Sequence, residues 1–356
     1  MSWLFGNPAM RPHIRLGPIL IALCLAAATA ACHTSYAYRA RTVSPRVTAS
    51  ADHSVKARLR ILVFGDSGKV TRIQTAVARG MKDTCTATPC DFGLVLGDNI
   101  YLEGVSSARD PKLGKAFHAA YDPLRLDLWM VPGNHDWYND AAKTLQPAID
   151  HTNDPSNTGS WRMPAAHYAV PRLPPWIHIY ALDSSVLYDL VRKPKGAHAA
   201  ELQQAKDAEL ADARAELCGP SGWKILAAHH FTYSNGTVHG RDSGLLAPIL
   251  HPLIGDCGVR LFLAGHDHDQ EHLKVKFSRT GGQYEYDHVI EGAAAEAKAV
   301  GSGRSDAATQ LWRKDAGGFA ILDVSPDQLT VSFFVCDEHA SSNPCKPDPH
   351  KPSIPR

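Results

Sequence analysis

The segment Leu59-Arg-Ile-Leu-Val-Phe-Gly-Asp-Ser-Gly68 decides the fold class. Its first six residues are mostly apolar and are typical of a buried strand, and they run directly into a glycine and a carboxylate. Similar short apolar runs recur along the chain. Between them lie segments that repeat apolar residues at helical spacing, such as Thr71–Met81 and Ala199–Cys218. This alternation predicts an α/β architecture.

Nine apolar runs are expected to be strands. Six belong to the alternating part: Leu59–Phe64, Phe92–Leu96, Leu126–Val131, Trp176–Leu182, Trp223–Ala227 and Val259–Ala264. Three more follow with no helical segment between them, so antiparallel pairing is expected there: Tyr284–Ile290, Phe319–Val324 and Leu329–Val335. We therefore expect one folded domain over residues 58–337. Residues 338–356 contain five prolines and are expected to form a tail that adds no core.

The N-terminus has the layout of a secretory signal. Arg11 and Arg15 precede an uncharged run, Leu16–Ala31, which is shorter than the roughly 20 apolar residues that a membrane-spanning helix needs. The residues Thr29-Ala30-Ala31-Cys32 resemble the lipobox of bacterial lipoproteins. We expect residues 1–31 to be a signal peptide, Cys32 to carry lipid, and residues 32–57 to be a flexible tether. Cleavage without lipidation and a true membrane anchor are the alternatives.

Composition excludes several classes of protein. The 356 residues are 44% hydrophobic and 21% charged, which rules out disorder and collagen. With 37 basic and 36 acidic side chains, the net charge of +1 offers no basic face for nucleic acid. The expected partner is a small-molecule substrate, with membrane contact only through the N-terminal lipid, and we expect a monomer. The expected location is the periplasm or cell envelope, or secretion if Cys32 is unmodified.

Six cysteines remain outside the N-terminal segment: Cys85, Cys90, Cys218, Cys257, Cys336 and Cys345. An even number of cysteines in an exported chain predicts disulfides, and six allow 15 pairings. Proximity along the chain favours Cys85 with Cys90 and Cys336 with Cys345, which leaves Cys218 for Cys257. A zinc cluster is the rival interpretation, although no Cys-x-x-Cys spacing occurs.

Five of the expected strands end in polar clusters. In open α/β sheets the carboxyl ends of the strands form the ligand crevice, so five separate segments are predicted to deliver polar groups to one edge. The clusters are Gly65-Asp66-Ser67-Gly68, Gly97-Asp98-Asn99-Ile100-Tyr101, Gly133-Asn134-His135-Asp136, His229-His230 and Gly265-His266-Asp267-His268.

These clusters have the chemistry of a metal site. Carboxylates, an amide, imidazoles and a phenol supply oxygen and nitrogen donors, and no cluster contains a thiol, which favours hard or borderline metals. Six or seven ligands exceed one tetrahedral zinc and suit two ions that share a carboxylate, as in phosphatases. Any single cluster could instead cap a helix or hold a loop. Five clusters at the same structural position favour the metal site.

In this order and spacing the clusters resemble the blocks of the calcineurin-like metallophosphoesterases. Within that superfamily the sequence is similar to purple acid phosphatases, particularly the mammalian, tartrate-resistant type. Most of the superfamily has Asp-x-His in the first block, whereas here Gly68 replaces the histidine. Tyr101, three residues after Asp98, matches the phenolate that purple acid phosphatases use. The resemblance covers most of residues 59–336 and implies a four-layer α-β-β-α sandwich with two mixed sheets.

The resemblance also implies a set of metal ligands. It places Asp98 between two ions and distributes six further ligands: Asp66, Tyr101 and His268 on one metal, and Asn134, His229 and His266 on the other. A phenolate favours Fe(III) at the first site, and the second site takes a divalent iron, zinc or manganese in the family.

The resemblance implies hydrolysis of phosphate monoesters by a metal-bound hydroxide. His135 is free to hold phosphate or protonate the leaving oxygen, and His239 is the second candidate. His239 lies ten residues after His229, whereas the mammalian-type proteins have a histidine nine residues on. The alternatives are a phosphodiesterase or nucleotide pyrophosphatase on the same metals, an SGNH-type serine esterase using Ser67, and a non-catalytic surface binding protein.

Overall fold

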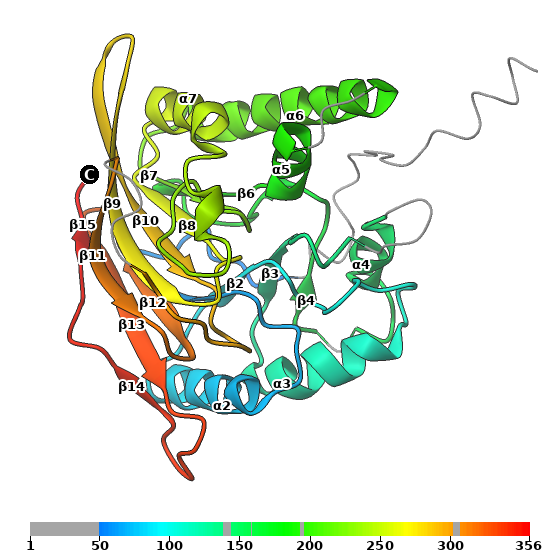
Figure 1. Ribbon diagram of the computed structural model, residues 1–356. Coiled ribbons are helices and arrows are strands. Elements are labelled where there is room, and N and C mark those ends of the chain that lie inside the picture. The colour runs from blue at the N-terminus through cyan, green and yellow to red at the C-terminus, as the bar shows by residue number, and fades with distance from the viewer. Residues whose placement is uncertain (1–49, 138–143, 158, 193–195, 302–306) are drawn as a thin grey trace, which may run out of the picture.

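The computed structural model describes residues 50–137, 144–157, 159–192, 196–301 and 307–356. The expected signal peptide, Cys32 and the first part of the tether lie outside this range. Two β-sheets pack face to face in the described part, and helices cover their outer faces (Figure 1). The protein is therefore the expected α/β sandwich of four layers, with two mixed sheets.

The first sheet carries β1 at its centre. The strands β1, β2, β3 and β4 run parallel, and β1 pairs antiparallel with β12, which continues to β13. Two short strands, β14 and β15, pair antiparallel with β13. The bounds are β1 Leu59–Phe64, β2 Phe92–Leu96, β3 Leu128–Val131, β4 Trp161–Arg162, β12 Gly318–Val324, β13 Leu329–Cys336, β14 Cys345–Pro347 and β15 Ser353–Ile354.

The second sheet has the order β11-β9-β10-β8-β7-β6-β5. Strands β6, β7, β8 and β10 are parallel, and antiparallel pairs lie at both sides of them. The bounds are β5 Tyr168–Ala169, β6 Ile177–Ala181, β7 Trp223–Ala227, β8 Leu261–Ala264, β9 Gln270–Arg279, β10 Gly282–Glu291 and β11 Ala308–Lys314.

The helices form the two outer layers. The helices α2, α3 and α4 lie on the side of the first sheet, and α5, α6 and α7 lie on the side of the second sheet (Figure 1). A π-helical turn, Leu113–His118, leads into α3, and two 3₁₀ turns lie at Asp122–Leu124 and Gly240–Asp242. The α-helical bounds are α2 Arg72–Ala87, α3 Ala119–Tyr121, α4 Gln146–His151, α5 Ser184–Arg192, α6 Gly196–Leu217 and α7 Ala247–Cys257. None of the helices in the described residues is long and apolar enough to cross a membrane.

Strand β1 shows why residues 61–64 of the deciding segment are all apolar. Ile61 and Val63 point into the core between the sheets, whereas Leu62 and Phe64 point into the core beneath α2. Because successive side chains of a strand alternate between faces, a strand buried on both faces must be apolar at every such position. The following helix, α2, begins at Arg72 and is capped by Thr71, whose side chain accepts a hydrogen bond from the Gln74 amide at 3.0 Å.

The expected strands are confirmed within about two residues at each end, but two expectations about the chain ends are wrong. The C-terminal tail does add core, because Ile354 is buried between the sheets and β14 and β15 extend the first sheet. The last residues of the expected tether, 50–57, pack on the domain. His53 is buried with its ring 5.4 Å from that of Phe92, and the Ala51 amide donates to Asp127 at 3.0 Å.

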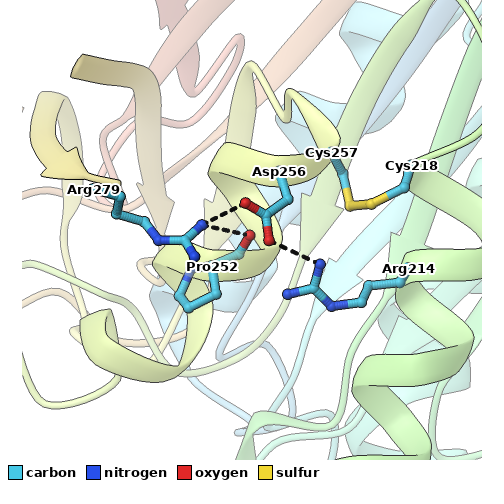
Figure 2. Close-up of a disulfide and its surroundings, with 6 residues drawn as sticks. All are labelled: Arg214, Cys218, Pro252, Asp256, Cys257 and Arg279. Carbon is cyan, nitrogen blue, oxygen red and sulfur yellow. Dashed lines mark hydrogen bonds and ion pairs between the residues drawn. A yellow bond between two sulfur atoms is a disulfide. The ribbon is translucent and has the colours of Figure 1, made fainter. Parts of the chain in front are cut away.

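All six cysteines in the described residues form disulfides, so the rival zinc cluster is wrong. The pairs are Cys85–Cys90, Cys218–Cys257 and Cys336–Cys345, as proximity along the chain favoured. Figure 2 shows that Cys218–Cys257 joins the C-terminal ends of α6 and α7. Beside it, Asp256 accepts from Arg214 at 3.0 Å and from Arg279 at 2.6 Å. This disulfide and ion-pair network fixes the second sheet's helical layer.

Candidate metal centre

The five polar clusters converge where the carboxyl ends of strands from both sheets meet. β1, β2 and β3 carry Asp66, Asp98 and Asn134, while β7 and β8 carry the histidine clusters. Asp66, Asp98 and His266 have φ angles of 53°, 51° and 72°, in a region that residues other than glycine rarely adopt. Strained backbone of this kind is found mostly at functional sites, and it persists only where the surrounding structure stabilises it.

Three of the expected ligands form one group of donor atoms. The Tyr101 hydroxyl donates to Asp66 Oδ1 at 3.0 Å and lies 3.3 Å from His268 Nε2. His268 Nε2 is 3.4 Å from the same Asp66 oxygen. These are the three residues that the family resemblance assigns to the first metal, and their donor atoms face one another.

Three further expected ligands form a second group. His229 Nε2 lies 3.1 Å from Asn134 Oδ1 and 3.2 Å from His266 Nδ1. Asp98 connects the two groups, since its Oδ1 is 3.4 Å from His229 Nε2 and its carboxylate lies close to that of Asp66. The structure thus brings all seven expected ligands together, with Asp98 in the middle.

Surrounding bonds orient these side chains. His229 Nδ1 lies 2.8 Å from the Leu96 carbonyl, which leaves Nε2 to face Asn134 and Asp98. Asp136 is buried and accepts hydrogen bonds from the Asn99, Ile100 and Gly133 amides at 2.7–3.1 Å. These bonds hold the loop that carries Asp98.

The charge distribution of the site suits cations. Asp66 and Asp98 are buried carboxylates. Although burial opposes a charge on His229, the Asp98 and Asp66 carboxylates raise the pKa of His229 to about 10. Burial and the same two carboxylates raise the pKa of the Tyr101 phenol well above its usual value. The site therefore carries negative potential that a metal ion would balance.

The two candidate catalytic histidines flank the donor groups without joining them. The His135 amide donates to Asp98 Oδ1 at 2.9 Å, its Nδ1 lies 2.6 Å from the Leu102 carbonyl, and its Nε2 is 4.0 Å from Asp98 Oδ2. The His239 ring stacks on the His266 ring at 3.9 Å, and its amide donates to Asp267 at 2.8 Å. Both rings are therefore beside the donors and available to a substrate.

Comparison with known families agrees with this geometry. Residues 59–270 match the calcineurin-like phosphoesterase family. The chain belongs to this family. It is a metallophosphoesterase of the purple acid phosphatase type and therefore a hydrolase. The chain is 26% identical over 311 residues to tartrate-resistant acid phosphatase type 5 of Oryctolagus cuniculus. This alignment covers 77% of this chain and 86% of the relative. It is 25% identical over 253 residues to purple acid phosphatase 7 of Arabidopsis thaliana, with 65% and 73% covered.

Solved structures share the fold. GAP50, titled as the anchor in the inner membrane complex of Plasmodium, matches with a TM-score of 0.63 at 19% identity, covering 84% of this chain and 89% of that one. The purple acid phosphatase PPD1 of yellow lupin (Lupinus luteus) matches with a TM-score of 0.53 at 16% identity, covering 81% and 53%. At these identities the likeness concerns the fold alone.

The site of this phosphoesterase fits metal ions. Seven oxygen and nitrogen donors from five loops face one another, and two of them are the buried carboxylates of Asp66 and Asp98. A serine esterase does not fit, because Ser67 is fully buried and no base among the described residues is hydrogen-bonded to its hydroxyl. The donor set matches two ions that share Asp98.

Sequence reasoning missed two supporting residues. Asp267 accepts from Ser234 Oγ and from the His239 amide, so it ties the His239 loop to the metal-binding motif. Asn99 Nδ2 donates to the Val131 carbonyl at 2.9 Å and to Asp136 at 2.8 Å. Both residues belong to the polar clusters that follow the strands. Their place in those clusters could have identified them from the sequence.

Proposed function

We propose that the protein is a phosphatase that cleaves phosphate monoesters with Fe(III) and a divalent iron, zinc or manganese ion. The observation that carries the proposal is Tyr101. Its hydroxyl lies within hydrogen-bond distance of Asp66 and His268, while Gly68 stands where most of the superfamily has a histidine. A phenolate at this place favours ferric iron over a second divalent ion.

Each expected ligand would hold an ion in the group where it lies. Asp66, Tyr101 and His268 would hold the ferric ion, whereas Asn134, His229 and His266 would hold the divalent ion, with Asp98 shared. When bound, the ions supply an activated water nucleophile and charge that stabilises the phosphoryl oxygens.

The chain's own residues then position the ester. His135 has its Nδ1 beside the Leu102 carbonyl, which fixes the ring so that Nε2 faces the site. His239 is fixed by stacking on His266 and by the bond from its amide to Asp267. From these positions the two imidazoles can bind phosphoryl oxygens and deliver a proton to the leaving oxygen.

The experiment compares phenyl phosphate with diphenyl phosphate, using protein without the N-terminal segment. Monoester hydrolysis that exceeds diester hydrolysis, and that is lost in Asp98→Asn, would support the proposal. The reverse preference would identify a phosphodiesterase on the same centre. Activity that depends on Ser67 and survives Asp98→Asn would overturn it in favour of a serine esterase, and failure to hydrolyse any ester would indicate a binding protein.

We also propose that the protein is exported. The three disulfides of the described part support an oxidising compartment, because cytosolic proteins rarely keep such bonds. The signal peptide and the lipid on Cys32 rest on the sequence. Mass spectrometry of the mature protein tests them, and a chain that begins at an acylated Cys32 is the expected result.

A further inference from the structure

A cavity of about 650 Å³ lies at the edge of the second sheet where β6, β7 and β8 begin. Trp176, Trp223 and Arg260 line it, and each stands at or directly before the first residue of one of these strands. The metal centre follows the opposite, carboxyl ends of β7 and β8. Because β7 has five residues at about 3.3 Å each, roughly 16 Å separate the cavity from the metal ligands. The cavity is therefore a second place on the protein, and its volume is in the range of small-molecule sites.

Hydrogen bonds fix the walls of this cavity. The Trp176 indole N–H donates to the Lys56 carbonyl at 3.1 Å, and the Trp223 indole N–H donates to the Ser325 carbonyl at 2.7 Å. The Trp223 amide donates to the Trp176 carbonyl at 2.9 Å. Gly222 allows this approach, because its φ is 108° and a Cβ there would lie 2.4 Å from the Trp176 carbonyl oxygen. Since its N–H is occupied, the half-buried Trp176 indole offers a ligand apolar ring surface.

The side chains that line the cavity make it positively charged. Arg260 and Arg356 are its ionisable side chains, and no acidic side chain of the described residues lines it. The Arg356 guanidinium lies 5.8 Å from the centre of the Trp223 ring. The Arg260 backbone is fixed, because its amide donates to the Lys224 carbonyl at 3.2 Å and its carbonyl accepts from the Asp287 amide at 3.0 Å. The cavity therefore holds one anchored and one exposed guanidinium.

Arg260 differs from the other half-buried arginines of the described residues. Its guanidinium makes no hydrogen bond or ion pair within the part of the chain that the structure describes. Each of the others pairs with an aspartate at 2.6–3.0 Å, as Figure 2 shows for two of them: Arg60, Arg162, Arg214 and Arg279. Because a charge taken out of water without a partner is costly, Arg260 is the group of the cavity that calls for an anion.

We propose that this cavity binds a small aromatic anion, whose carboxylate or phosphate group pairs with Arg260 and whose ring lies against Trp176. A planar carboxylate matches the fork of a guanidinium, which can donate two parallel hydrogen bonds to it. The ring covers apolar indole surface that a bare ion would leave in water. Arg356 adds a second positive charge on the exposed side of the cavity. The site is separate from the proposed phosphatase reaction and does not depend on it.

The experiment titrates the purified protein by calorimetry with naphthoate, with naphthalenemethanol, which lacks the charge, and with acetate, which lacks the ring. We expect naphthoate to bind at least about tenfold more tightly than either. Arg260→Gln should weaken naphthoate binding about tenfold, and Arg356→Gln should weaken it about threefold because that guanidinium is exposed. The matched control is Arg79→Gln, because Arg79 is an exposed arginine of α2, on the side of the first sheet. Naphthoate binding should be unchanged in this control.

Asp98→Asn separates the two places where an anion could bind, because Asp98 is an expected metal ligand far from the cavity. Naphthoate binding that persists in this variant, whatever its phosphatase activity, would support the proposal. Binding lost in Asp98→Asn would place the anion at the metal centre and overturn it. Equal binding of naphthoate and naphthalenemethanol would overturn it as well, and so would equal losses in Arg260→Gln and Arg79→Gln or no naphthoate binding at millimolar concentration.

Discussion

Replacing Gly68 by alanine should damage the metal centre, although Gly68 is not one of the expected metal ligands. A Cβ built on Gly68 would lie 2.2 Å from the Asn99 carbonyl carbon and oxygen and 2.4 Å from the Ile100 nitrogen. The φ angle of Gly68 lies outside the left-handed region, so the effect would come from space and not from backbone conformation. The atoms that must move belong to the loop between Asp98 and Tyr101.

The size of the effect follows from those distances. Real Cβ contacts are not shorter than 3.0 Å, so the Asn99 peptide would have to move by about an ångström. Backbone atoms cannot rotate away as a side chain can, so we expect a cost at the upper end of the overpacking range, about 3 kcal/mol. The loop is bound to Gly68 on both sides, through Gly68 N to Asp98 O at 3.1 Å and Tyr101 N to Gly68 O at 3.2 Å. A shift of this size should lower activity about 100-fold.

Urea denaturation, metal analysis and phenyl phosphate hydrolysis together test the prediction. The control is Gly114→Ala in the π-helical turn, where a Cβ meets nothing within 4 Å. Alanine there should keep activity and stabilise the protein by up to about 1 kcal/mol. A Gly68→Ala protein with wild-type stability, metal content and activity would refute the reasoning, and equal losses in both variants would show that the effect is not local.

Three further predictions concern stability. Cys218–Cys257 spans 39 residues and Cys85–Cys90 spans 5, so alanine at both cysteines of each pair should lower the free energy of unfolding by about 4 and about 2 kcal/mol; equal losses in denaturant titrations would contradict the loop-closure argument. Burial lowers the pKa of His288 to about 4, so the unfolded chain binds a proton that the folded protein does not between pH 6.5 and 4. The stability that neutral His288 contributes is complete above pH 6.5, and up to about 3 kcal/mol of it is lost as the pH falls toward 4. His288→Phe should therefore reduce the loss of stability at acidic pH, as measured by urea denaturation at a series of pH values. An unchanged loss would rule out His288 as its cause. A chelator that removes the metals should lower the free energy of unfolding by about 4 kcal/mol, relative to protein in a free metal concentration about one thousand times the dissociation constant. Return of the metals should restore the stability. A thermal melt that does not respond to chelation would argue against metal ions at the cluster.

The strands were predictable where nearly every residue of a short run is apolar. β1 and β2 match their expected bounds because both faces of these strands are buried. β9 was missed, since Lys274 and Lys276 alternate with Val275 and Phe277 and only one face of that segment is apolar. Ile354 was missed for another reason: a lone apolar residue among prolines carries no periodic signal, and only pairing with β13 buries it.

The grouping of the site residues was predictable, and their orientation was not. The rule that ligands gather at the carboxyl ends of strands brought Asp66, Asp98 and Asn134 to one edge. Which nitrogen of His229 faces the site depends on the Leu96 carbonyl, a backbone group that no side-chain motif reports. The pairing of Glu296 with Lys69 beside His268 joins residues 227 positions apart, which local sequence cannot reveal.

Metal content and the visible spectrum of the purified domain test the central claim most directly. The account predicts two metal ions per chain, one of them iron, with a broad visible absorption band that disappears in Tyr101→Phe. Two bound metals without a visible band would contradict the phenolate on ferric iron. A metal-free protein that hydrolyses phosphate esters at the wild-type rate would contradict the metal centre itself.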